Sequence, residues 1–240
     1  MNILIVNDDG IASDGILRLA RAAKEFGKVY VVGPARQCSG MSMKLTIYEE
    51  IELKPYDFPI EVAGAWCLDG TPVDCVKIAR SELLPEEPDW VFSGVNNGYN
   101  TGCDLLYSGT FGAATEAVLN GIPAAAFSAA YDAPREVVDA NLTKVIAELL
   151  SRPIDLSAAW NVNFPGCAPS ELKGIRWDVE PAHIQLYTDH ITRRTAPDGR
   201  VFLTQGGIPI GRELAPEGSD AHAVLHNYIA IGKVRNLVTL

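Results

Sequence analysis

The sequence predicts an α/β fold, in which a Rossmann-like, mostly parallel sheet is flanked by helices. Short runs rich in β-branched apolar residues alternate with segments of helical periodicity up to about residue 165. Turn-forming Gly, Pro and Asn residues separate these segments. Such alternation is typical of a parallel sheet with helices on both faces. Because 240 residues permit one large domain, we expect a single domain over 1–240, with a core at about 1–165 and a C-terminal extension at about 170–240.

The alternation begins with the first residues. The apolar run 3–6 is expected to form a buried strand that ends at the polar residues before Gly10. Ser13 fits the N-cap of a helix whose apolar residues recur at helical spacing until Gly27. The second core strand is expected at 28–34, where a glycine and a proline end the apolar run.

The middle of the chain continues the pattern. Residues 35–46 have no clear period and predict a functional loop, and short strands are expected at 47–53 and 60–66. Thr71 followed by Pro72 marks the start of a helix, because proline suits the first helical position. The remaining core elements are expected as a strand at 89–96, a helix at 111–120, a strand at 123–130, a helix at 137–150 and a strand at 159–166.

The pattern changes after about residue 170. A long hairpin is expected at 183–207, turning at 197–199, followed by a helix and a strand within 218–232. Asp220, directly after Ser219, is expected to cap that helix. Nothing in this region is apolar enough to form a separate core. We therefore expect a hairpin and helix extension of the same domain, used in oligomerisation.

The composition argues against several classes of protein. A net charge of −10 disfavours binding to a nucleic-acid polymer or to an anionic membrane. No apolar run approaches the about 18 residues that a membrane span needs. The five cysteines are odd in number and lack the C-x-x-C spacing of zinc or redox sites. We therefore expect reduced thiols in a cytoplasmic protein, and the early first strand leaves no room for a signal peptide.

The strongest candidate for chemistry is the pair of adjacent carboxylates Asp8 and Asp9. Asp-Gly is a common turn dipeptide, so these residues could simply bend the chain at Gly10. Two adjacent carboxylates repel each other, however, unless a cation lies between them. Ser39 and Asn96 also follow core strands and add a hydroxyl and an amide oxygen. This set of oxygen ligands predicts one divalent ion, Mg²⁺ or Mn²⁺, and argues against zinc.

A second candidate site lies where the helix near residue 111 begins. Ser108, Gly109 and Thr110 would place free backbone N–H groups and two hydroxyls there, and phosphate is the usual ligand of such a site. Asn100 and the glycines around it would let the backbone approach the same anion. The plain alternative is a capped helix preceded by turns. Because these loops follow core strands, we expect them to converge at one edge and to support metal-assisted phosphoryl chemistry.

Other catalytic motifs are absent or incomplete. The chain has no Walker loop, no G-x-G-x-x-G after the first strand and no G-x-S-x-G elbow. His222 and His226 have helical spacing but lack the glutamate of H-E-x-x-H, so a structural role is favoured. Two alternatives remain. A phosphohydrolase of the haloacid-dehalogenase type would carry D-x-D rather than adjacent aspartates, and a non-catalytic nucleotide or polyphosphate sensor need not keep a carboxylate pair.

These residues resemble the SurE (survival protein E) family of 5′/3′-nucleotidases over most of the chain. The motifs that carry the resemblance are ILIVNDDGI at 3–11, SGMS at 39–42 with LT at 45–46, GTPVDCV at 70–76, SGVNNGYNTG at 93–102, YSGTFGAATEA at 107–117, NVNFP at 161–165 and SDAHAVLHNYIAI at 219–231. Three departures stand out. Cys38 occupies a position where a basic or polar residue is common in the family, the end GKVRNLVTL lacks the family's frequent Thr-Pro-Leu close, and the segment 170–215 matches loosely.

The resemblance implies a metal-dependent phosphatase that hydrolyses nucleoside monophosphates to nucleoside and phosphate. It leaves open 3′-nucleotidase and short-chain exopolyphosphatase activity. It implies a cytoplasmic homodimer or homotetramer whose C-terminal segments are exchanged or packed between subunits. The divalent ion, Mg²⁺ or Mn²⁺, is expected on Asp8, Asp9, Ser39 and Asn96, and one of the two aspartates would serve as base or nucleophile. The expected substrate contacts are Gly40, Asn96, Asn100, Ser108, Gly109 and Thr110.

Overall fold

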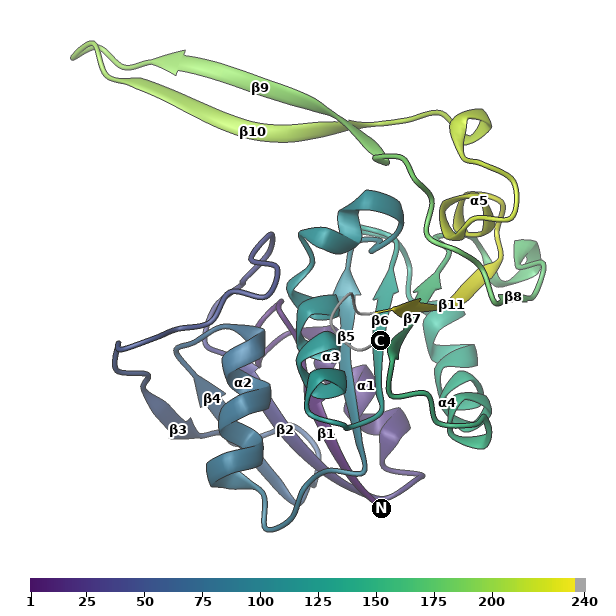
Figure 1. Ribbon diagram of the computed structural model, residues 1–240. Coiled ribbons are helices and arrows are strands. Elements are labelled where there is room, and N and C mark those ends of the chain that lie inside the picture. Colours follow the sequence, from purple (N-terminus) through teal and green to yellow (C-terminus); the bar gives the residue numbers. More distant parts are fainter. Residues whose placement is uncertain (236–240) are drawn as a thin grey trace.

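The computed structural model describes residues 1–235 and confirms the α/β fold, with a mostly parallel sheet at its centre (Figure 1). Its strands are β1 (Asn2–Val6), β2 (Lys28–Pro34), β3 (Leu53–Pro55), β4 (Gly64–Leu68), β5 (Trp90–Asn97), β6 (Ala124–Ala129), β7 (Ala158–Phe164), β8 (Ile175–Trp177) and β11 (Ile229–Arg235). They lie in the order β3-β4-β2-β1-β5-β6-β7-β11-β8. The six strands from β4 to β7 are parallel, whereas β3 and β11 run antiparallel to β4 and β7.

Helices cover both faces of the sheet (Figure 1). They are α1 (Asp14–Ala23), α2 (Pro72–Ile78), α3 (Gly109–Leu119), α4 (Glu136–Ser151) and the short α5 (Asp220–Leu225). Because side chains alternate along a strand, β1 contributes apolar side chains to the cores on both faces of the sheet. Ile3 and Ile5 pack with the apolar residues of α1 and α4, whereas Leu4 and Val6 pack with those of α2 and α3. No helix within residues 1–235 is long and apolar enough to cross a bilayer.

The chain order of the strands reverses beside β1. Strand β1 pairs in parallel with β2 on one side and with β5 on the other. The connections after β1 and β5 therefore leave toward opposite faces of the sheet, which is the topological position at which ligands bind in such folds. Residues 8 and 39 lie in the loops after β1 and β2, and residue 96 lies at the carboxyl end of β5, so all three are at this edge.

Most expected elements are confirmed, but the two short strands were placed wrongly. Neither a helix nor a strand lies between Pro34 and Leu53, and the expected strand at 47–53 is reduced to β3 at its far end. The reason is Tyr48, which adopts a positive φ of 63° and turns the chain instead of extending it. The strand expected at 60–66 is β4, which begins at Gly64, after the backbone N–H of Ala63 reaches the carbonyl of Val29.

The expected C-terminal hairpin is also confirmed. Strands β9 (Tyr187–Thr195) and β10 (Val201–Pro209) form a separate antiparallel ribbon, which we call the arm, and it projects away from the sheet (Figure 1). Every residue of both strands is exposed. The chain then returns through α5 to β11, which lies between β7 and β8. Residues 236–240, the end of the expected extension, lie outside the described residues.

The expectation that Asp220 caps α5 was wrong. Ser219 is the N-cap, and its hydroxyl accepts the backbone N–H of His222 at 3.1 Å. The buried carboxylate of Asp220 instead accepts the N–H groups of Gly102 and Ala182, at 3.0 and 2.9 Å. Because Ser219 already supplies the cap, Asp220 is free to join the stem of the arm to the loop after β5.

The packing of α1 on the sheet depends on Gly15. A Cβ atom at this position would lie 2.0 Å from the carbonyl oxygen of Val95, so only glycine permits the helix to approach β5 this closely. We expect Gly15→Ala to lower the free energy of unfolding by about 2–4 kcal/mol, as an overpacked core substitution does. Urea denaturation would measure the change. Arg21→Ala, on the exposed side of the same helix, should change it by less than about 0.5 kcal/mol. Equal effects of the two substitutions would contradict this interpretation.

Candidate functional site

The turn after β1 holds the two adjacent carboxylates outside the strand. Strand β1 ends at Val6, and Gly10 adopts a φ of 101°, so the chain has left the sheet before Asp8 and Asp9. The buried side chain of Asn7 closes this turn, because its Nδ2 donates to the carbonyl of Gly10 at 2.9 Å and to the hydroxyl of Ser13 at 2.8 Å. The two carboxylates are therefore not forced onto opposite faces of a strand, which was the condition for sharing an ion.

Asp8 lies against the first turn of α3. Its carboxylate accepts a hydrogen bond from the Thr110 hydroxyl. Gly109 allows this approach, since a Cβ atom there would be only 3.1 Å from the Cβ atom of Asp8. The backbone carbonyl of Asp8 accepts the N–H of Cys38 at 2.7 Å, which fixes the loop after β2 beside the carboxylate. Asp8 thus joins three elements: the turn after β1, the loop after β2 and the start of α3.

The ionised form of Asp8 is disfavoured in this environment. Burial raises the pKa of its carboxyl group from 3.8 to about 6. The hydrogen bond from Thr110 opposes this rise, and the neighbouring charge of Asp9 adds to it. The protein therefore keeps a buried acid next to a second carboxylate, an arrangement that a cation would stabilise in its ionised form.

Asp9 is more accessible and is held by the last residue of β5. Its carboxylate accepts the backbone N–H of Asn97 at 2.9 Å, and Gln37 lies at 3.5 Å. The side-chain oxygen of Asn97 in turn accepts from Arg135 at 2.6 Å and from the N–H of Asp132 at 3.0 Å. The sequence reasoning missed these residues. The second asparagine of SGVNNG was a visible signal for Asn97, but nothing in the sequence marks Arg135.

Asn96 lies at an irregularity of β5. The register between β5 and β6 shifts between Ser93 and Asn96. The Nδ2 of Asn96 donates to the carbonyl of Gly98 at 2.9 Å, so the amide oxygen points the other way. The shift places Asn96 and Asn97 at the end of the strand, beside the turn that holds Asp9.

Ser39 and Gly40 lie in the loop after β2. Both are exposed, and Gly40 adopts a φ of 70° with no atom within 4 Å of its missing Cβ position. The hydrogen bond from Cys38 to Asp8 brings this loop to the same edge as the carboxylates. The hydroxyl of Ser39 makes no hydrogen bond to another residue of 1–235, so it is open to solvent.

The start of α3 has the geometry of an anion site. Ser108 is the N-cap, and its hydroxyl accepts the N–H of Phe111 at 3.0 Å. The first regular helical bond runs from the N–H of Gly112 to the carbonyl of Ser108. The N–H groups of Gly109 and Thr110 therefore have no acceptor within the helix. The expected group at 108–110 thus lies together with Asp8, and the helix dipole favours negative charge beside it.

Asn100 lies apart from this group, in a buried amide network. Its Nδ2 donates to Ser128 at 2.8 Å, and its carbonyl accepts from the side chains of Asn161 and Asn163, at 2.9 and 3.0 Å. Its own N–H donates to Asn163 at 2.9 Å. These contacts tie the loop after β5 to β6 and β7. A phosphate contact from Asn100 stays a prediction.

The two histidines on α5 belong to neither candidate site. The rings of His222 and His226 stack with centroids 4.0 Å apart, and Nδ1 of His226 lies 2.8 Å from the carbonyl of His222. In the part of the chain that the structure describes, no three His, Cys, Asp or Glu side chains form a metal-binding group.

The comparisons with known proteins point to one family. A family model described as "Survival protein SurE" matches residues 3–184. The chain is 36% identical over 235 residues to "5'-nucleotidase SurE" of Pelotomaculum thermopropionicum, covering 98% of this chain and 89% of that protein. It is 43% identical over 178 residues to the protein of the same name from Neisseria gonorrhoeae, covering 73% of this chain and 70% of that protein.

A solved structure agrees with these relatives. The crystal structure of the SurE protein from Aquifex aeolicus matches with a TM-score of 0.83 at 33% identity, covering 99% of this chain and 95% of that one. The expected resemblance is thereby confirmed over the core and over most of the segment after residue 170. On the family model, the relatives and the shared fold, this chain belongs to the SurE family.

Proposed function

We propose that this chain is a metal-dependent 5′-nucleotidase that hydrolyses nucleoside 5′-monophosphates to nucleoside and phosphate. The observation that carries this proposal is the buried carboxylate of Asp8, which lies beside Asp9 and against the first turn of α3. The names of the relatives from Pelotomaculum and Neisseria support the same activity. Hydrolysis of 3′-nucleotides and short polyphosphates is proposed as a further range of the same site.

The residues present fit a hard divalent cation. Within residues 1–235, no ion pair involves Asp8 or Asp9, so no arginine or lysine balances the two carboxylates. A buried carboxylate without a positive partner is costly. Asp8, Asp9, Ser39 and Asn96 would hold one Mg²⁺ or Mn²⁺ ion, because carboxylate, hydroxyl and amide oxygens are the ligands that these ions prefer. When bound, the ion would polarise the phosphoryl oxygens and lower the pKa of bound water.

The chain's own groups would orient the substrate and stabilise charge. The phosphate would lie at the start of α3, where the N–H group of Gly109, which has no acceptor within the helix, would face the negative charge that grows in the transition state. The Thr110 hydroxyl keeps the Asp8 side chain in place, and the N–H of Asn97 does the same for Asp9. One of these two carboxylates would accept the proton of the attacking water or attack phosphorus itself. Unaided phosphate-monoester hydrolysis is so slow that about 20 kcal/mol or more of barrier reduction is needed.

We also propose that the arm joins copies of this chain into a homodimer or homotetramer. An isolated two-stranded ribbon has little stability of its own. The arm nevertheless exposes large apolar side chains, among them Ile191, Phe202, Leu203 and Ile208. Covering these residues against a second copy would bury both the apolar surface and the free strand edges. The five free cysteines support a reducing, cytoplasmic location.

The activity can be tested directly. Metal-free protein is supplied separately with Mg²⁺, Mn²⁺ and Zn²⁺, and phosphate release is measured from 5′- and 3′-nucleoside monophosphates. We expect release with Mg²⁺ or Mn²⁺, and a loss of at least about 10³-fold in Asp8→Asn and Asp9→Asn. Glu148→Gln, which changes a partly exposed carboxylate on α4, should keep full activity. Absence of release with every ion from folded protein would instead favour a non-catalytic nucleotide or polyphosphate sensor.

Asp8 should destabilise the metal-free protein above its own pKa. Its pKa is about 6 in the folded protein against 3.8 in the unfolded chain, so the unfolded chain loses this proton first as pH rises. The resulting loss of unfolding free energy is absent below about pH 4 and complete above about pH 6, where it amounts to about 3 kcal/mol. Asp8→Asn should therefore raise the unfolding free energy of metal-free protein at pH 8 but not at pH 4. Parallel pH profiles for both proteins would contradict this explanation, and Mn²⁺ should stabilise only the wild type.

The arm can be removed at its stem. The backbone N–H of Ile210 donates to the carbonyl of Leu186 at 2.9 Å, so two glycines can replace residues 187–209 between them. We expect the shortened protein to keep its fold, seen by circular dichroism, and to show a lower oligomeric order by light scattering. An unchanged oligomer mass would show that the arm does not hold the subunits together.

A further inference from the structure

The loop that carries Ser39 and Gly40 has little structure of its own. No helix or strand lies between Pro34 and Leu53. Within this stretch no atom lies within 4 Å of the position that a Cβ atom of Gly40 would occupy, and Ser42 adopts a positive φ of 51°. The position of residues 38–46 therefore depends on where they are tied to the rest of the protein. We call these residues the ligand loop.

Two of its ties reach the site itself. The N–H of Cys38 donates to the carbonyl of Asp8 at 2.7 Å, and the N–H of Ser42 donates to the carbonyl of Tyr107 at 3.0 Å. The loop also passes close over α3, where a Cβ atom at Gly112 would be 2.5 Å from the carbonyl oxygen of Ser42. These contacts use backbone groups and hold the first half of the ligand loop.

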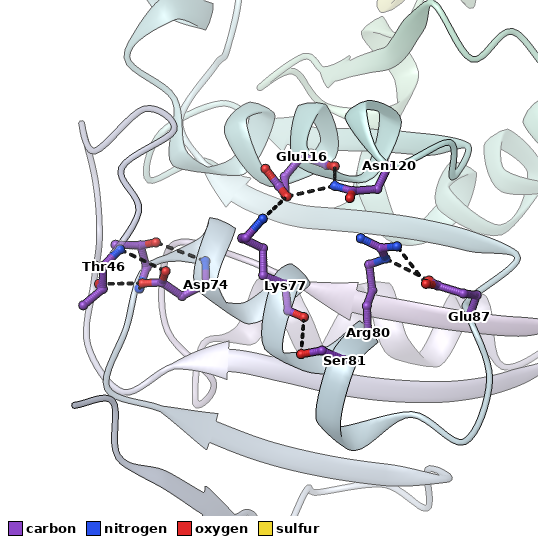
Figure 2. Close-up of polar contacts among 9 residues, drawn as sticks. Thr46, Asp74, Lys77, Arg80, Ser81, Glu87, Glu116 and Asn120 are labelled. Carbon is purple, nitrogen blue, oxygen red and sulfur yellow. Dashed lines mark hydrogen bonds and ion pairs between the residues drawn. The ribbon is translucent and has the colours of Figure 1, made fainter. Parts of the chain in front are cut away.

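The second half is held by side chains at the start of α2. Both oxygens of the Asp74 carboxylate face Thr46: Oδ1 accepts its N–H at 3.0 Å, and Oδ2 accepts its hydroxyl at 2.7 Å. The hydroxyl of Thr71 donates to the carbonyl of Lys44 at 2.6 Å. Figure 2 shows Thr46 and Asp74 turned toward each other, while Lys77 and Arg80 of the following turns reach other partners.

These bonds exceed what the helix needs. Thr71 and Asp74 form a capping box, in which each side chain accepts the other residue's N–H group, at 3.2 and 2.9 Å. A capping box is complete with that pair alone. Asp74 is buried, however, and makes two further bonds to a residue 28 positions earlier in the chain. Because both bonds go to one residue, a shift of the ligand loop by a single position would break them together.

We propose that Asp74 is a positioning residue: through Thr46 it sets the place of the ligand loop, and hence of Ser39 and Gly40, over the phosphate end of the active site. The proposal rests on the proposed nucleotidase function. It assigns to Asp74 an effect on metal and substrate binding in addition to its effect on α2. Charge-assisted hydrogen bonds to a buried carboxylate are strong enough for such a role.

The test uses substitutions at Thr46, which is half-buried and lies outside the helix. Thr46→Val removes the hydroxyl donor and keeps the shape, and Thr46→Ser keeps the donor. We expect Thr46→Val to lower kcat/KM for nucleoside 5′-monophosphates by about tenfold, mainly through KM, with weaker Mn²⁺ binding. Hydrogen exchange of residues 38–46 should become faster, whereas the melting temperature should stay near that of the wild type. Thr46→Ser should restore all of these values.

Asp74→Asn and Arg80→Gln complete the comparison. Asp74→Asn should produce the larger loss, because an amide cannot accept at both positions. Arg80→Gln, in the helical turn after α2, removes the two hydrogen bonds to Glu87 and should leave kcat/KM unchanged. Activity of Thr46→Val and Asp74→Asn within twofold of Arg80→Gln would overturn the inference. Wild type without activity would instead overturn the proposed function, and the exchange rates and Mn²⁺ affinities of Thr46→Val and Thr46→Ser would then decide the role of Asp74.

Discussion

The burial of the Asp8 carboxylate against the first turn of α3 is the constraint on which the site depends. Gly109 favours this approach because a Cβ atom there would crowd the Asp8 side chain at 3.1 Å, and Thr110 is placed to donate to the carboxylate. The same burial raises the pKa of Asp8. A fold that only needed a turn after β1 would leave this carboxyl group in water, where it is ionised without penalty. The site therefore retains an unfavourable charge that a bound cation would offset.

The neighbouring loops are arranged around this carboxylate and its partner. The loop after β2 reaches the backbone of Asp8 through Cys38, and the end of β5 reaches the side chain of Asp9 through Asn97. Arg135, at the start of α4, donates a hydrogen bond to the side chain of Asn97 and so links the end of β5 to α4. Because α/β sheets bring the ends of parallel strands to one edge, each loop needs only a few such bonds to bring its polar groups together.

Much of this arrangement could be predicted from the sequence, for identifiable reasons. Buried parallel strands read as apolar runs, so β1, β2, β5, β6 and β7 were found where expected, and the polar residues after them marked the edge. Tyr48 and Asp220 were misjudged because their roles depend on distant contacts. Nothing in the local sequence indicates that the chain turns at Tyr48, or that Asp220 accepts N–H groups from residues 102 and 182. Arg135 escaped notice for the same reason.

Asp220 and Asp74 also show why buried carboxylates recur around this edge. Each accepts backbone N–H groups from a segment far away in the sequence: Asp220 from the stem of the arm and the loop after β5, and Asp74 from the end of the ligand loop. A carboxylate suits this purpose, because it can accept several bonds in different directions from chains that share no regular structure. Regular backbone hydrogen bonds between neighbouring strands fix where the strands of the sheet end. The irregular segments beyond the sheet have no such regular hydrogen bonds to align them. Their positions depend on a few backbone bonds and on these acidic side chains, so we expect a change at one of the acids to displace the end of a loop while leaving the sheet intact.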